Sequence, residues 1–259
     1  MFKLLAVFLF GLAAGSFSNV CIYRIPLNMS VSTPRRSFCP WCRHQIKWHQ
    51  NIPLLSFLVQ RARCAFCKSR ISSRYFYVEL LLPLIVLGFL ISKPHLTIMG
   101  LVLIGTTVFF AIAISFIDLD WRIIPDTLSL PWLAMTFLFA PLNPLFEALP
   151  WNEAYTQAML GAAAAAFVVW VTLFCGRLVK KRDVMGWGDV KLMACWGAGL
   201  GWLHGALVFF MAAALATTWI IFCFLFKKLR SNDFLPFGPF INIAGLMILW
   251  ACLSGNVLF

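Results

Sequence analysis

Apolar runs recur along almost the whole chain, and short polar segments separate them. The hydrocarbon core of a bilayer is about 30 Å thick, so a helix that crosses it needs roughly 20 mostly apolar residues. The pattern therefore predicts an all-α polytopic membrane protein. It indicates about eight transmembrane helices, of which the second, fourth and sixth are short: 2–22, 77–92, 96–117, 127–143, 155–176, 190–203, 205–226 and 236–256.

The first apolar run could instead be a signal peptide that is removed after export. It is longer than the apolar core of most signal peptides, no A-x-A site follows it, and Arg24 lies on its far side. We therefore expect residues 1–22 to remain as the first transmembrane span.

Residues 23–76 form the long polar stretch of the chain, and they hold two CxxC pairs. Cys39 and Cys42 form the first pair, Cys64 and Cys67 form the second, and 21 residues separate the pairs. Two such pairs can supply the four thiolates of a tetrahedral zinc site. So short a segment buries only a small core, which makes a structural metal physically sensible. We expect a small zinc-ribbon-like domain; a disordered basic loop with chance cysteines is the alternative.

The net charge of +12 is distributed unevenly along a chain that is 62% hydrophobic. If the amino terminus lies outside, 19 of the 21 Lys and Arg residues fall in the inner loops, which are 23–76, 118–126, 177–191 and 227–235. The positive-inside rule then sets the orientation, and the basic residues meet anionic lipid rather than nucleic acid. The four loop cysteines therefore face the cytoplasm, where thiols stay reduced and bind metal rather than form disulfides.

Five of the nine acidic residues lie in two short segments at predicted cytoplasmic ends of spans. Asp118 ends the third predicted span and Asp189 opens the sixth, so both are expected at the same membrane depth. Ionisable groups at such a boundary are functional candidates. Two carboxylates that share a proton can act as acid and base and activate water against an amide. We therefore expect Asp118 and Asp189 to be the catalytic pair.

The other acids in these segments have simpler interpretations. Asp126 follows Pro125 and precedes a new apolar run, which is typical of a helix N-cap. Asp120 and Asp183 are expected to be solvated loop charges.

Several motifs in order make the chain resemble the prepilin peptidases, the type IV leader peptidase family of membrane aspartic proteases. In the first of these motifs, Gly11 to Val20, Ser18 stands where family members more often have an apolar residue. The motifs that carry the resemblance are Gly11 to Val20, the four cysteines, Asn51-Ile-Pro53, Arg74-Tyr75 with Val78-Glu79-Leu80, Phe116-Ile-Asp118 with Pro125-Asp126, Gly186-Trp-Gly188-Asp189-Val-Lys191, and Pro236-Phe-Gly238-Pro239.

The resemblance implies a protease of the bacterial inner membrane. Such an enzyme cuts the short basic leader of type IV prepilins or pseudopilins after a glycine, at the cytoplasmic face. Family members with the cysteine domain typically also methylate the new amino terminus, with S-adenosylmethionine as the methyl donor. The chain would then consist of a first span (1–22), a cytoplasmic four-cysteine metal-binding domain (23–76) and a multi-span membrane peptidase domain (77–259).

The site of methyl transfer is less defined in the sequence, because no Gly-rich dinucleotide fingerprint follows a strand. We expect it near the cysteine domain and the cytoplasmic end of the first span. Glu79 is a weak candidate to orient the amine, and a salt bridge to Arg74 is its alternative role. A transporter or channel and a noncatalytic zinc scaffold for pilus or secretion assembly remain as alternative functions. The sequence identifies neither the client nor an oligomeric state.

Overall fold

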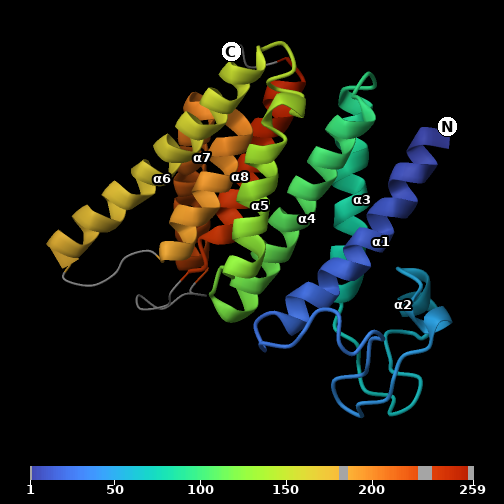
Figure 1. Ribbon diagram of the computed structural model, residues 1–259. Helices are drawn as coiled ribbons and strands as arrows, with labels where there is room; N and C mark the ends of the chain where they lie inside the picture. Colours follow the sequence, from blue (N-terminus) through green and yellow to red (C-terminus); the bar gives the residue numbers. More distant parts are fainter. Residues whose placement is uncertain (1, 181–185, 227–234, 256–259) are drawn as a thin grey trace. The chain divides into compact units, whose positions relative to one another are not determined.

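A computed structural model describes residues 2–180, 186–226 and 235–255, and the named elements of these ranges are all helices (Figure 1). Five of the described helices are long and apolar enough to cross a membrane. They are α1 (Phe2–Arg24), α3 (Arg74–Ser92), α4 (Ile98–Trp121), α6 (Trp151–Lys180) and α7 (Trp187–Leu225). The prediction of an all-α multi-span membrane protein is confirmed, and the number of eight spans stays a prediction.

Three further α-helices are shorter: α2 (Leu55–Val59), α5 (Asp126–Leu138) and α8 (Gly238–Leu253). The chain forms two compact units, and α4 contributes to both. The first unit comprises Met1–Pro94 with Ile104–Ala113, and the second comprises His95–Leu103 with Ile114–Phe259.

In the first unit, α1 packs closely against α3 because two glycines one turn apart face the partner helix. A Cβ atom on Gly11 would lie 2.7 Å from the Cβ of Pro83. A Cβ atom on Gly15 would lie 2.8 Å from the Cα of Glu79. Small residues at this spacing let two membrane helices approach to backbone contact. The glycines of the opening motif therefore set the position of Glu79 relative to α1.

The polar segment after α1 is organised by the buried side chain of Arg24, which is 4% exposed. Its guanidinium donates hydrogen bonds of 2.9 to 3.3 Å to the backbone carbonyls of Ser30, Val31, Pro34 and Arg36. Five N–H groups in a rigid fork suit this role, because they can satisfy several carbonyls at once. Arg24 thus holds the start of the cysteine domain against the end of α1.

In the second unit, α7 consists of two helical halves, 187–200 and 202–225, which meet at Gly201 with φ of 81° and ψ of 175°. A Cβ atom on Gly205 would lie 2.6 Å from the Cα of Gly197. Residues eight apart in a straight helix are separated by about 12 Å along the axis. The chain therefore folds back at Gly201, where the positive φ favours glycine.

The halves of α7 correspond to the sixth and seventh predicted spans, 190–203 and 205–226. The α6 helix packs along α7, with Gly161 against Gly197, and α5 and α8 pack on α7 as well (Figure 1). The fourth predicted span, 127–143, was too long, because α5 ends at Leu138 and a separate 3-10 turn, Ala140–Leu142, follows. The proline within this turn is consistent with the break in the helix.

Candidate functional site

Asp118 lies near the carboxyl end of α4 and is only 6% exposed. Its Oδ2 accepts a 2.8 Å hydrogen bond from the backbone N–H of Gly238, the first residue of α8. A Cβ atom at position 238 would lie 2.8 Å from the same oxygen, so a glycine is needed for this approach. The positive end of the α8 dipole also favours a carboxylate at this place.

Asp189 lies in the first turn of α7 and is 7% exposed. Its Oδ2 accepts a 3.1 Å hydrogen bond from the backbone N–H of Gly186, the N-cap residue of the helix. Asp189 is therefore held in the same manner as Asp118, by a glycine amide at a helix amino terminus.

The two carboxylates lie close enough to act on each other electrostatically. Their hydrogen bonds within the described residues end on the Oδ2 atoms. The Oδ1 atoms are thus left for water or a substrate. Repulsion between two such carboxylates would separate their titrations, so that one could act as a general acid and the other as a general base.

A buried polar contact ties together the three helices around these carboxylates. Asn242 of α8 accepts a 2.9 Å hydrogen bond from the indole N–H of Trp196 and donates one of 2.9 Å to the hydroxyl of Ser115. Ser115 lies one turn before Asp118, and Trp196 lies two turns after Asp189. Sequence analysis missed this contact, although polar residues inside apolar spans were a usable signal.

Asp126 does not have the predicted N-cap role. The N-cap of α5 is Pro125, and Asp126 lies in the first turn of the helix. Its carboxylate forms an ion pair of 2.6 Å with the ammonium of Lys191, two residues after Asp189. The pair is solvent-exposed and links α5 to α7. Asp120 is exposed, but it lies in the last turn of α4 and not in a loop as predicted. Asp183 lies outside the described residues.

The four cysteines of the polar domain converge, and their Sγ atoms all lie within 4.8 Å of one another. Two short hairpins bring them together, one closed by a bridge between Phe38 and Gln45 and the other by a bridge between Arg63 and Arg70. In each hairpin, the residue that follows the second cysteine has a left-handed backbone. The two CxxC pairs therefore adopt the same local geometry and present four thiols to one point.

The sulfur spacing fits a tetrahedral metal. Zinc–sulfur bonds of about 2.3 Å place neighbouring sulfurs of a tetrahedron ~3.8 Å apart. The Sγ atoms of Cys39 and Cys67 are 3.8 Å apart. All four cysteines are free, so no disulfide competes for these sulfurs.

The pKa values of two thiols in the cluster are shifted in opposite directions. The Ser69 hydroxyl, 3.0 Å from the Cys67 sulfur, and the Ser69 amide lower the pKa of Cys67 to about 6. The His44 amide lowers the pKa of Cys42, but the neighbouring thiols of Cys39, Cys67 and Cys64 raise it, to about 11 overall. Four thiolates so close together repel one another, and a bound divalent cation would remove that penalty.

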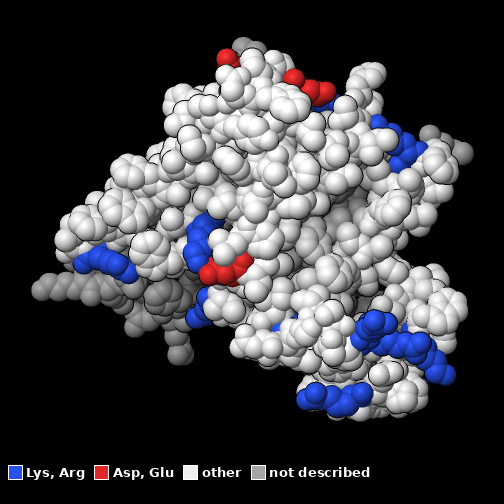
Figure 2. All heavy atoms as spheres, in the orientation of Figure 1, with Lys and Arg blue, Asp and Glu red and all other residues white. Residues whose placement is uncertain are grey.

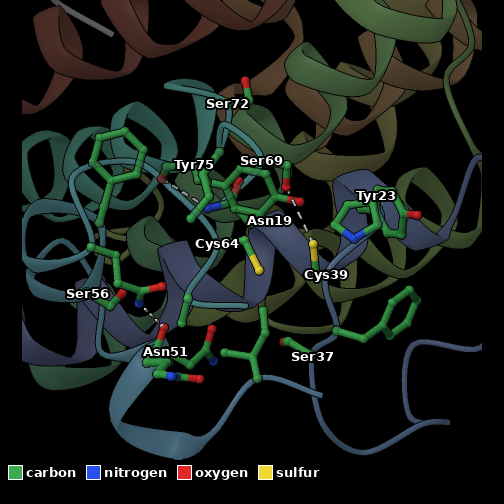
Figure 3. Close-up of a pocket in the computed structure, with 18 of the residues that line it drawn as sticks. Asn19, Tyr23, Ser37, Cys39, Asn51, Ser56, Cys64, Ser69, Ser72 and Tyr75 are labelled. Carbon is green, nitrogen blue, oxygen red and sulfur yellow. Dashed lines mark hydrogen bonds between the residues drawn. The ribbon is translucent and has the colours of Figure 1, made fainter. Parts of the chain in front are cut away.

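A cavity of about 630 Å³ lies inside the first unit, between α1, the cysteine domain and the start of α3 (Figure 3). Glu79 lines it and is 8% exposed, and its Oε2 accepts a 2.8 Å hydrogen bond from the backbone N–H of Leu54. The alternative role of Glu79, a salt bridge to Arg74, is not found among the described residues. Asn19 and Arg24 also line the cavity, and sequence analysis gave neither of them a role.

These features define a class: a multi-span membrane protein with paired buried carboxylates and a four-cysteine domain. Residues 9–92 match the bacterial peptidase A24 N-terminal domain, and residues 103–221 match the type IV leader peptidase family. The chain belongs to this family, as its motifs predicted. Family membership favours an enzyme over the transporter and scaffold alternatives.

The similar proteins are named prepilin leader peptidase/N-methyltransferase. The protein from Aeromonas salmonicida (strain A449) is 35% identical over 271 residues, which cover 94% of this chain and 89% of that protein. The protein from Legionella pneumophila is 34% identical, with coverages of 96% and 91%, and that from Klebsiella pneumoniae is 38% identical, with coverages of 76% and 84%. No solved structure matches the chain significantly.

Proposed function

We propose that this chain cleaves the leader peptide of type IV prepilins or pseudopilins with Asp118 and Asp189, and then methylates the new amino terminus. The relatives' names supply the two activities. The observation that carries the peptidase assignment is the pair of buried carboxylates, each held by a glycine amide at a helix amino terminus.

In the proposed cleavage, one aspartate is ionised and takes a proton from water while the other is protonated. The water oxygen attacks the scissile carbonyl, and the acid gives its proton to the leaving amine. The glycine amides of residues 186 and 238 hold one oxygen of each carboxylate. Holding one oxygen of each carboxylate would leave the other free to exchange protons with water and substrate, which supports this assignment.

The proposed orientation places the cysteine domain and the carboxylate pair on the cytoplasmic side of the bacterial inner membrane. Residues 23–76 carry ten Lys and Arg and no acidic residue. Figure 2 shows basic atoms gathered on the cysteine domain, with no acidic atoms among them. The two halves of α7, together with the shorter α5 and α8, would complete eight spans.

The proposed metal at Cys39, Cys42, Cys64 and Cys67 is a structural zinc ion. Four thiolates complete a tetrahedral site and leave no position for a substrate, so the ion would stabilise the small domain rather than take part in either reaction. S-adenosylmethionine is the proposed methyl donor, in keeping with the methyltransferase name of the relatives.

The peptidase assignment is tested with purified protein in lipid and a full-length prepilin whose two products are measured by mass. Asp118→Asn and Asp189→Asn are expected to abolish cleavage, because each removes one partner of the proton exchange. Glu147→Gln, which alters an exposed acid elsewhere, is the control and should cleave normally. Full cleavage by either aspartate variant removes that residue from the catalytic role.

A further inference from the structure

We propose that the cavity of the first unit is the methyl-donor site, and that it binds an adenosyl sulfonium with Glu79 facing the positive sulfur and Asn19 facing a neighbouring N–H group. This inference rests on the proposed methyl transfer and assigns that activity to particular residues. Its first support is size, because about 630 Å³ falls within the range of pockets that enclose small organic ligands.

The second support is an unsatisfied buried acceptor. Asn19 is 3% exposed, and its Nδ2 donates a 3.1 Å hydrogen bond to the backbone carbonyl of Tyr75. Its Oδ1 is buried and has no hydrogen-bond partner in the described part of the chain. Figure 3 shows Asn19 in the cavity wall near Tyr75, Ser69 and Cys64. Buried acceptors are nearly always paired, so this oxygen indicates a place for an N–H group of a ligand.

The third support is the charge of the cavity wall. Glu79 is the one acidic residue among the described residues that line the cavity. The surrounding segment 23–76 is basic throughout. A sulfonium ion would be repelled by such a wall unless a carboxylate faced it. A buried carboxylate gains in turn from a cation, because burial disfavours an uncompensated charge.

The fourth support is the aromatic lining. Tyr23, Phe38, Trp41 and Phe66 contribute rings to the same cavity. Trp41 is 77% exposed, so this large ring has surface that a planar base could cover, whereas the Phe66 ring packs against His44. Aromatic faces stack on a purine and attract a sulfonium by cation–π interaction. The wall therefore offers a surface for each part of the donor.

The local packing explains why Glu79 can stand at this place. Gly15 of α1 lies against the backbone of Glu79, and a side chain there would displace it. The Leu54 amide then binds one carboxylate oxygen and orients the group. In the transfer itself, the lone pair of the amine attacks the methyl carbon while the carbon–sulfur bond breaks onto sulfur. The sulfonium becomes a neutral thioether, and the positive charge passes to the nitrogen of the methylated amine.

The test compares two ligands that differ in charge at sulfur. S-adenosylmethionine is a sulfonium, whereas S-adenosylhomocysteine is a neutral thioether. Equilibrium dialysis of radiolabelled ligands against the purified, zinc-loaded protein gives both Kd values. Glu79→Gln should raise the Kd for S-adenosylmethionine by about tenfold or more, because a charge-assisted contact is lost. It should change the Kd for S-adenosylhomocysteine by less than about threefold, because the lost contact involves only the charged sulfur.

A second variant separates Asn19 from Glu79. Asn19→Ala should weaken both ligands in parallel, because its oxygen faces a group that the two share. Glu147→Gln is the control for the loss of a carboxylate, and zinc content with the elution volume reports folding of every variant.

Three outcomes decide the inference. Unchanged binding of both ligands by Glu79→Gln and Asn19→Ala overturns the site. Equal weakening of both ligands by Glu79→Gln overturns the placement of the sulfonium. If the unaltered protein cleaves prepilin but binds neither ligand, the proposed methyl transfer itself fails, which is a different result.

Discussion

The backbone N–H of Gly238 donates a 2.8 Å hydrogen bond to Oδ2 of Asp118, although 120 residues separate them in the sequence. The start of α8 therefore holds a carboxylate at the end of α4. The bond makes α8 part of the proposed active site, even though that helix contributes no catalytic side chain.

Replacing Gly238 with alanine should damage cleavage while leaving the cysteine domain intact. The added Cβ would lie 2.8 Å from the carboxylate oxygen, so Asp118 or α8 must move. A displacement of about 1 Å at a reacting group can cost about 100-fold in rate. We expect kcat for prepilin cleavage to fall by about 10- to 100-fold, measured by product mass over time.

Gly105→Ala is the matched control for this substitution. A Cβ at that position of α4 meets nothing within 4 Å, so the rate should stay normal. An unchanged rate in Gly238→Ala contradicts the view that α8 positions Asp118.

Trp196→Phe tests the buried contact between α4, α7 and α8. The substitution keeps a large aromatic ring but removes the indole N–H that binds Asn242. A buried acceptor left without its donor costs about 1 to 3 kcal/mol. We expect a lower thermal midpoint and a smaller kcat with little change in KM.

The control for this variant is Trp219→Phe, which alters a half-exposed tryptophan of the same helix and should have little effect. If both variants behave alike, the hydrogen bond has no special role in holding the carboxylate pair.

Much of the fold follows from sequence because apolar length alone locates a membrane helix. The predicted spans that begin at residues 2, 77, 96 and 155 correspond to α1, α3, α4 and α6 with shifts of only a few residues. The CxxC spacing likewise predicted that four sulfurs would converge, because local chain geometry brings each pair together.

Other features depend on contacts between distant segments, which no local pattern encodes. The oxygen of Asn19 becomes an unpaired buried acceptor only when the cysteine domain and the start of α3 cover it. Asp126 had the expected sequence context of an N-cap, but Lys191 lies 65 residues away and binds its carboxylate. The competition between a local cap and a distant ion pair was decided by tertiary packing.

The pH dependence of metal retention should depend on Ser69. Its hydroxyl and amide hold the pKa of Cys67 at about 6, below the usual value for a thiol. Since the thiolate is the metal ligand, protons compete with zinc for it, and zinc should be released on acidification. Ser69→Ala raises the pKa, so its zinc release should begin at a higher pH.

A metal-sensitive dye can follow the released zinc during acid titration of the purified protein. Ser73→Ala is the control, because the Ser73 side chain makes no capping hydrogen bond at α3. Coincident release curves for Ser69→Ala and the unaltered protein would show that Ser69 does not stabilise the Cys67 thiolate.

Peptide cleavage and methyl transfer should be separable, because each proposed site is built within one unit of the chain. Hydrolysis needs two carboxylates and a water, whereas methyl transfer needs a neutral amine aligned with a sulfonium methyl group. A free amino terminus has a reference pKa of about 8. A modest loss of hydration lowers this pKa, so that a larger fraction of the amine is neutral. We therefore expect Asp189→Asn, supplied with a pre-cleaved prepilin and S-adenosylmethionine, to add the methyl group at close to the normal rate. Mass measurement of the product checks this. Glu79→Gln should cleave intact prepilin but add little methyl group to the same pre-cleaved client. If Asp189→Asn binds the donor but does not methylate, the aspartates serve both reactions and the two-site arrangement is wrong.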